Sequence, residues 1–167
     1  MKKRDRKKAK RQENNRKKRL APVSAPPTRK SLSQQSPNGD FMDRPVRWTA
    51  QTVDTGFNKL GCRWDLTPPE TKQLLNFLSD MSAKKWKEVW SAGSGTGHRM
   101  HHRQDVTSIH KLAQERLIEL GHSDEESLYR FRIQGTVRLW GFRTGDVFRI
   151  LWYDPDHQVS PTTKRNT

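Results

Sequence analysis

Residues 129–153 read YRFRIQGTVRLWGFRTGDVFRILWY, and this stretch decides the fold. Apolar and polar side chains alternate along it, which is typical of strands with one buried face. Two segments, Gln134-Gly135 and Arg143-Thr144-Gly145-Asp146, interrupt the alternation and predict tight turns. We therefore expect three antiparallel strands in a meander, and a short tail strand around residues 158–159. Trp152 is expected in the core, on one face with Phe148 and Ile150.

The residues upstream of this stretch follow a helical period. Thr67-Pro68-Pro69-Glu70 predicts a helix start, because Thr67 and Glu70 can form a capping box and the prolines stand where no N–H is needed. A second helix is expected after Ser82, and a third from about residue 106 to 120. A short strand is expected earlier, within residues 46–50. The order predicts an α+β fold, with N-terminal helices packed on one face of a C-terminal antiparallel β-meander.

Charge and aromatic residues divide the chain of 167 residues into two parts. The net charge is +15, and residues 1–30 carry fourteen basic and two acidic residues, a net +12. All fourteen aromatic residues lie at or beyond Phe41. We expect residues 1–40 to be a disordered basic arm with a Pro/Ser-rich linker, residues 41–161 to form the folded domain, and residues 162–167 to be a tail.

The composition also excludes several classes of protein. No apolar run approaches the roughly 18 residues of a membrane span, so no membrane partner is expected. The single Cys62 excludes an intramolecular disulfide framework and a cysteine-rich zinc site. The expected location is therefore the cytoplasm, or the nucleus in a eukaryotic cell.

Basic residues of the arm predict contacts with nucleic-acid phosphates. Such contacts release counterions, so binding would be strong, dependent on salt and independent of base sequence. The residues expected to make them are Lys7, Lys8, Arg16, Lys17, Lys18 and Arg19. RNA or the ribosome is the first expected partner, and DNA is the second.

The predicted strands add a second group of basic residues. Arginine binds phosphate with a fork of N–H donors and also stacks on bases. If several arginines share the open face of the sheet, that face is a second nucleic-acid contact, formed by Arg130, Arg132, Arg138 and Arg143. Trp140 has the same strand parity as Arg138, so we expect it to stack on a base.

Two regions contain histidines that could carry chemistry. His98, His101 and His102 form H-x-x-H-H, which is a weak metal signal, and we expect neither a metal nor a cofactor. A histidine beside a bound phosphate can instead be a general acid or base, and a surface histidine with no role is the remaining alternative. His157 follows Asp154-Pro155-Asp156, whose acids could orient it. His102 and His157 are thus candidate catalytic residues, with Arg138 stabilising the transition state.

Residues 128–159 resemble a small family of mainly bacterial uncharacterised proteins. The motifs R-x-W-G-x and L-W-[WY]-D-P-x-H-x-V-x-P recur in that family and correspond here to residues 138–142 and 151–161. The likeness covers roughly residues 46–161 and implies no assigned activity. More loosely, the helix-then-hairpin order is similar to RelE-like mRNA interferase toxins. That likeness implies metal-independent cleavage of messenger RNA and a cognate inhibitor protein, although three helices, rather than the usual two, are predicted before the sheet.

These observations lead to three hypotheses. The first is a nucleic-acid-binding protein associated with RNA or the ribosome, which uses the basic arm and the arginines of the sheet. The second is a metal-independent endoribonuclease with histidine acid–base catalysis. The third is a protein-interaction domain. Both leading hypotheses share the binding of nucleic acid.

Overall fold

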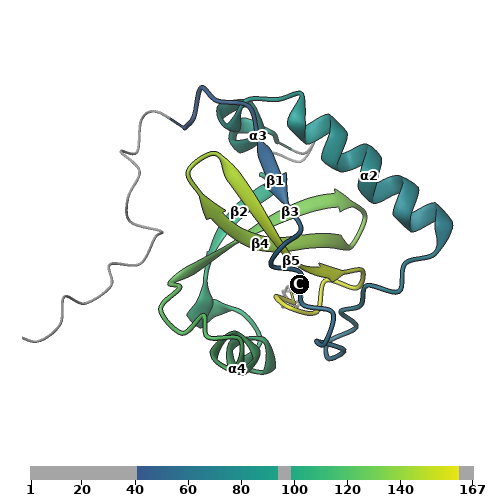
Figure 1. Ribbon diagram of the computed structural model, residues 1–167, viewed down its shortest axis with the longest axis vertical. Coiled ribbons are helices and arrows are strands. Elements are labelled where there is room, and N and C mark those ends of the chain that lie inside the picture. The colour runs from purple at the N-terminus through teal and green to yellow at the C-terminus, as the bar shows by residue number, and fades with distance from the viewer. Residues whose placement is uncertain (1–40, 94–98, 162–167) are drawn as a thin grey trace, which may run out of the picture. The chain divides into compact units, whose positions relative to one another are not determined.

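The predicted meander is present as three antiparallel strands of eight residues each. They are β3 (Ser127–Gln134), β4 (Val137–Thr144) and β5 (Val147–Asp154). They belong to a computed structural model that describes residues 41–93 and 99–161 (Figure 1). The expected arm and tail lie outside the described residues. The predicted tail strand is absent: Val159 is in no strand, and it is buried in the core.

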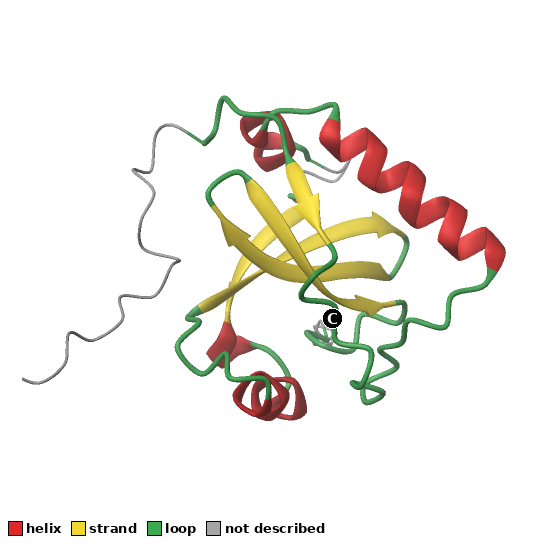
Figure 2. Cartoon of the chain, viewed as in Figure 1, coloured by secondary structure: helices red, strands yellow, loops and turns green. Residues whose placement is uncertain are grey.

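Two further strands make the sheet mixed rather than purely antiparallel. β1 (Arg47–Thr49) pairs in parallel with β5, and β2 (His101–Asp105) pairs antiparallel with β3, so the order is β1-β5-β4-β3-β2 (Figure 2). Turn residues predict pairing only between strands that follow one another along the chain. β1 and β5 are separated by about 100 residues, so no turn predicts that they pair. Residues 101–105 (HHRQD) have no apolar alternation, so no strand is predicted there.

The first helix begins where the sequence predicted, and the other two differ in their bounds. α2 (Pro68–Ser82) follows Thr67, whose backbone N–H donates to Glu70 Oε2 at 2.9 Å. α3 (Trp86–Ser91) begins after Lys85 rather than after Ser82. The predicted third helix is two elements, the 3₁₀ turn η2 (Val106–Ser108) and α4 (Lys111–Glu119). Extended backbone at Ile109 separates them, and the His110 side chain accepts the N–H of Leu112 at the start of α4.

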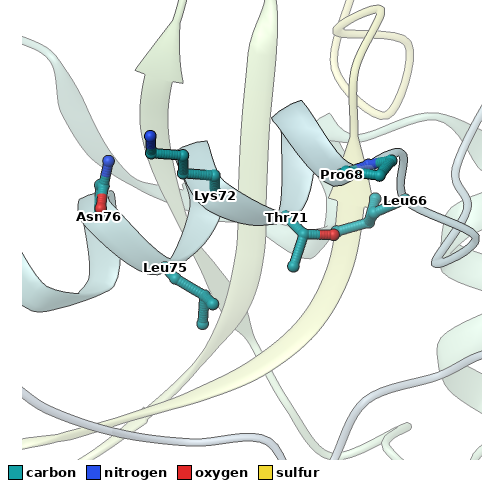
Figure 3. A pocket seen from close by; sticks show the side chains of 6 residues that line it. All are labelled: Leu66, Pro68, Thr71, Lys72, Leu75 and Asn76. Carbon is teal, nitrogen blue, oxygen red and sulfur yellow. The ribbon is translucent and has the colours of Figure 1, made fainter.

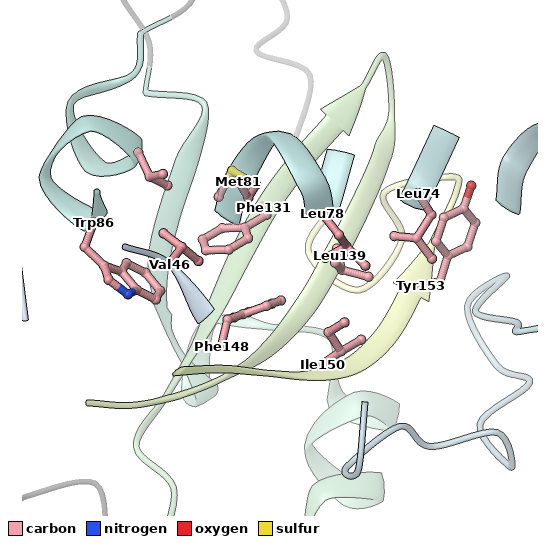
Figure 4. Packing of buried hydrophobic residues seen from close by; sticks show 11 residues of the cluster. Val46, Leu74, Leu78, Met81, Trp86, Phe131, Leu139, Phe148, Ile150 and Tyr153 are labelled. Carbon is pink, nitrogen blue, oxygen red and sulfur yellow. The ribbon is translucent and has the colours of Figure 1, made fainter. Parts of the chain in front are cut away.

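The helices cover both faces of the sheet, not one face as expected. α2 and α3 lie on one side and α4 on the other (Figure 1). Figure 4 shows the core beneath α2 and α3, which contains Trp86, Phe131, Leu139, Phe148 and Ile150. A second core lies on the α4 side. Its buried side chains from the strands form what we call the apolar half of that face: Leu128, Trp140, Phe142, Leu151 and Trp152.

An irregularity in β5 changes which side chains share a face. Trp140 is opposite Trp152, but Gly141 is opposite Ile150, so Leu151 is an extra residue in β5. Leu151 and Trp152 consequently both lie in the core on the α4 side, while Phe148 and Ile150 lie in the other core. The prediction that Trp152 is buried is confirmed, but its predicted face is wrong because simple counting by two ignores the bulge.

No helix within the described ranges has both the length and the apolar character needed to cross a bilayer.

Candidate functional site

Three arginines and two histidines meet on the α4 side of the sheet, beyond the apolar half. Phe131 and Leu139 point into the opposite core, so their neighbours Arg130, Arg132 and Arg138 lie on the α4 side. The register places them in two rows across the strands. His102 is opposite Arg130 in one row, and Arg132, Arg138 and Asp154 follow one another in the next. With His157, described below, we call Arg130, Arg132, Arg138 and His102 the arginine cluster.

His157 reaches the cluster from the turn after β5. Its Nε2 lies 3.0 Å from Nη1 of Arg130, and because a guanidinium can only donate, the imidazole nitrogen accepts. The backbone of His157 is left-handed, with φ of +57°. Asp154 fixes the turn by accepting the backbone N–H groups of Gln158 and Val159 at 2.9 and 3.1 Å. The predicted link between this acid and His157 therefore acts through the backbone of the turn.

His102 enters the cluster from β2 at the edge of the sheet. Its Nε2 lies 2.8 Å from the backbone carbonyl oxygen of Arg99. A carbonyl oxygen accepts, so Nε2 carries the proton and Nδ1 is the unprotonated nitrogen of the neutral ring. The two histidines are therefore opposite neutral tautomers, because His102 carries its proton on Nε2 and His157 carries its proton on Nδ1. His102 lies opposite Arg130, and His157 accepts a hydrogen bond from it.

The arginines of the cluster have no ion pair with an acid of residues 41–93 or 99–161. Arg138 Nη1 donates to the carbonyl oxygens of Gly135 and Val137 at 2.8 and 3.1 Å, and Arg130 donates to His157. The Nε of Arg130 is buried without a partner. The Arg132 side chain makes no hydrogen bond to the described residues. Elsewhere in the domain Arg116 pairs with Asp54 at 2.8 Å.

The local pKa values show a site of positive potential. Burial, together with Arg138, Arg130 and Arg132, lowers the pKa of His157 to about 4. Burial, followed by Arg130, also lowers the pKa of His102. The pKa of Arg138 falls to about 10 through burial and the neighbouring guanidinium groups. At neutral pH both histidines are therefore neutral, and the arginines remain charged.

Asp154 lies opposite Arg138, beside the arginine cluster, but its carboxylate oxygens already accept hydrogen bonds from other groups. Besides the two backbone N–H groups, it accepts the indole N–H of Trp140 at 3.1 Å. It is fully buried, and burial raises its pKa despite these donors. Asp154 therefore offsets part of the positive charge without forming an ion pair with any of the arginines. This arrangement suits an incoming anion.

Two residues predicted to bind nucleic acid lie elsewhere. Trp140 is fully buried in the apolar half, so it cannot stack on a base. Trp140 does lie on the same face of the sheet as Arg138, but α4 and neighbouring loops cover the part of that face where Trp140 lies. Arg143 lies on the opposite face, where Nε donates to the Tyr129 hydroxyl at 2.9 Å and the guanidinium stacks on Phe41 at 3.9 Å. The six predicted arm residues lie outside the described ranges.

His101 and His102 lie on opposite sides of β2. His101 is buried against Phe131, with ring centroids 5.0 Å apart, and burial lowers its pKa to about 4. The two rings are therefore not placed to bind one metal ion, and His98 lies outside the described residues. Among the residues that the structure describes, no group of three His, Cys, Asp or Glu side chains forms a candidate metal site.

A separate pocket lies along α2, on the far side of the sheet from the arginine cluster. Its volume is about 430 Å³, and its lining is largely aliphatic (Figure 3). The lining residues are Leu66, Pro68, Thr71, Lys72, Leu75 and Asn76. Lys72 is the charged member of this lining, so the pocket has neither the charge nor the convergent donors of the arginine cluster.

The sequence identified five members of the cluster but not the contacts that organise it. The hydrogen bond between His102 and the carbonyl oxygen of Arg99, and the unused donors of Arg132, could be identified only from the structure, in which β2 pairs with β3.

Comparison with protein-family models, with curated proteins and with solved structures finds no match.

Proposed function

We propose that this protein binds nucleic acid, RNA in the first place, and that the arginine cluster contacts a backbone phosphate. The observation that supports this most directly is the gathering of Arg130, Arg132 and Arg138 without an ion-paired acid among the described residues. Guanidinium forks match the oxygens of a phosphate, and positive potential attracts it. Two neutral histidines add further hydrogen-bonding groups.

The charge of the whole chain favours a polyanion over a small phosphate ester. Residues 1–30 supply +12 of the net +15, and a single small anion would need only the cluster. A nucleic acid offers many phosphates, so both the arm and the cluster can contribute to its affinity. The expected binding is salt-dependent and largely independent of base sequence.

Arg132→Gln tests the cluster directly. Because Arg132 makes no hydrogen bond to the described residues, its loss removes a phosphate contact without disturbing the fold. We expect RNA affinity to fall about tenfold and the salt slope to decrease by about one phosphate contact. The matched control is Arg47→Gln, which removes the same charge from an exposed side chain on β1. Equal affinities for the two variants would contradict the proposal for the cluster.

The arm is tested by deleting residues 1–30. This deletion removes most of the net charge but no aromatic residue, so residues 41–161 should keep their melting temperature. We expect a large loss of RNA affinity and a much shallower dependence on salt, measured by fluorescence anisotropy at several salt concentrations. Unchanged affinity would show that the arm has another role.

A metal-independent endoribonuclease is the second candidate function, and the convergence of His102 and His157 on Arg130 favours it. In such a reaction the 2′-hydroxyl oxygen attacks the adjacent phosphorus while a histidine takes the hydroxyl proton. The bond from phosphorus to the 5′-oxygen breaks, and that oxygen receives a proton from water or from the second histidine in its protonated form. Arg132 and Arg138 would stabilise the added negative charge.

Cleavage assays with and without ribosomes separate the two functions. If the protein is a ribonuclease, wild type should cut RNA in the presence of EDTA, and His102→Ala should lower the rate by roughly 10²–10⁴-fold while RNA binding is kept. Binding without cleavage in either setting would leave the first function. Cleavage that EDTA abolishes would refute the metal-independent mechanism.

A further inference from the structure

Arg130 is held by the side chain of His157 rather than by a carboxylate. Its Nη1 donates to His157 Nε2 at 3.0 Å, its guanidinium lies 5.9 Å from the ring centroid of Trp140, and its Nε has no partner. A neutral imidazole is a weaker acceptor for a guanidinium than a phosphate oxygen, because only the phosphate carries negative charge. An incoming phosphate can therefore replace Nε2 as the acceptor of this hydrogen bond.

Each strand packed around His157 places charged or titratable side chains near its imidazole ring. β2 contributes His102, β3 contributes Arg130 and Arg132, and β4 contributes Arg138. β5 contributes Asp154, whose oxygens accept from Trp140 and from the backbone of the turn. Asp156, in the same turn as His157, is exposed. Three permanent positive charges thus oppose a fourth on His157 until negative charge enters the cluster.

We propose that an RNA phosphate and one proton bind to the cluster together, and that Nε2 of His157 takes the proton. This inference rests on the proposed function, because it requires a phosphate at the arginines. The phosphate accepts the hydrogen bond of Arg130, which releases the lone pair of Nε2. Its negative charge offsets the arginines, so the imidazolium becomes stable and can donate to the phosphate through Nε2.

Proton uptake makes the affinity for RNA depend on pH in a defined direction. Affinity should increase as the pH falls from 8 toward 5, by at most about tenfold per pH unit when one proton is taken up. The arm does not contribute to this dependence, because lysine and arginine titrate above about pH 10. A proton taken up from the buffer on binding near pH 6 is therefore expected to be accepted by a histidine.

Calorimetry of the full chain with octauridylate at pH 6 tests the inference. Titrations in two buffers with different ionisation enthalpies give the number of protons bound with the RNA. We expect a large fraction of one proton for wild type and for the control His122→Gln, whose ring lies against Phe142 outside the cluster, and close to none for His157→Gln. The glutamine places an acceptor near the position of Nε2, so it keeps the contact with Arg130 but cannot titrate.

The outcomes separate this inference from the proposed function. RNA binding by wild type without proton uptake overturns the inference and leaves the function standing, as does uptake that persists in His157→Gln. Absence of any RNA binding overturns both. ¹⁵N NMR of the histidine ring nitrogens in wild type gives an independent measurement that needs no variant. The pKa of His157 should rise when octauridylate is added, and an unchanged titration also overturns the inference.

Discussion

The α4 side of the sheet contains two neighbouring regions that the same strands build in opposite ways. In the apolar half, Trp140 and Trp152 are fully buried, and their indole N–H groups donate to Asp154 and Asp54. In the arginine cluster, a few ångströms further along β3 and β4, no arginine has a carboxylate partner among the described residues. The first region satisfies its buried polar groups, whereas the second leaves cationic donors available. This difference separates a region that stabilises the domain from one suited to a ligand.

Removing a large side chain from the apolar half should produce the largest effect. Trp152→Ala should lower the free energy of unfolding by about 3–5 kcal/mol, because it leaves a cavity and removes one of the two side-chain donors to Asp54 Oδ2. Urea unfolding followed by circular dichroism measures the change. Trp48→Ala is the control, since Trp48 is 40% exposed on β1. Similar losses for both variants would remove the distinction between core and surface tryptophans.

Acid should destabilise the protein through the arginine cluster. The folded pKa of His157 is about 4, and its unfolded value is about 6.5. Between these values the unfolded chain binds a proton that the folded chain does not, so stability is kept above pH 6.5 and lost as the pH falls toward 4. The contribution is at most about 3 kcal/mol, and solvent screening reduces it because the His157 side chain is only partly buried.

His157→Gln isolates this contribution, because glutamine does not titrate. Its stability should change less than that of wild type between pH 7 and 4.5, measured by urea unfolding without RNA. His101, which is also buried with a pKa of about 4, retains its own contribution in this variant. An identical pH dependence for wild type and His157→Gln would show that the cluster does not hold this histidine neutral.

Two arginines of the cluster should differ in what they contribute to stability. Arg138→Gln should cost about 1 kcal/mol, since Arg138 donates to two backbone carbonyl oxygens near the β3–β4 turn. Arg132→Gln should change stability by no more than about 0.5 kcal/mol, as for an ordinary surface residue. Thermal unfolding compares the two. A larger loss for Arg132→Gln would place it in a structural contact.

Local patterns predicted the meander and much of the cluster. Alternation assigned Arg130, Arg132 and Arg138 to one face, and the position of His157 after β5 brought it to the same edge. Alternation states which face a side chain occupies, but not what covers that part of the face. For that reason Trp140 was expected among the arginines and is instead in the core.

Two other differences have separate causes. Arg143 was grouped with the other arginines, but it lies five positions after Arg138 along β4, and an odd offset places it on the opposite face. No strand was predicted around His102. It lies in β2, because the unpaired edge of β3 provides backbone partners that the sequence of residues 101–105 does not announce.

The parallel pairing of β1 with β5 has a consequence for the order of folding. β3, β4 and β5 are joined by short turns and can pair as soon as they meet, whereas Arg47 must find Val147 across 100 residues of chain. Closing such a loop costs entropy before any contact offsets it, so we expect β1 to join the sheet late. During synthesis, β1 emerges from the ribosome long before its partner exists. Its length of three residues and the exposed, charged side chain of Arg47 limit how strongly it can pair with another strand before β5 is made.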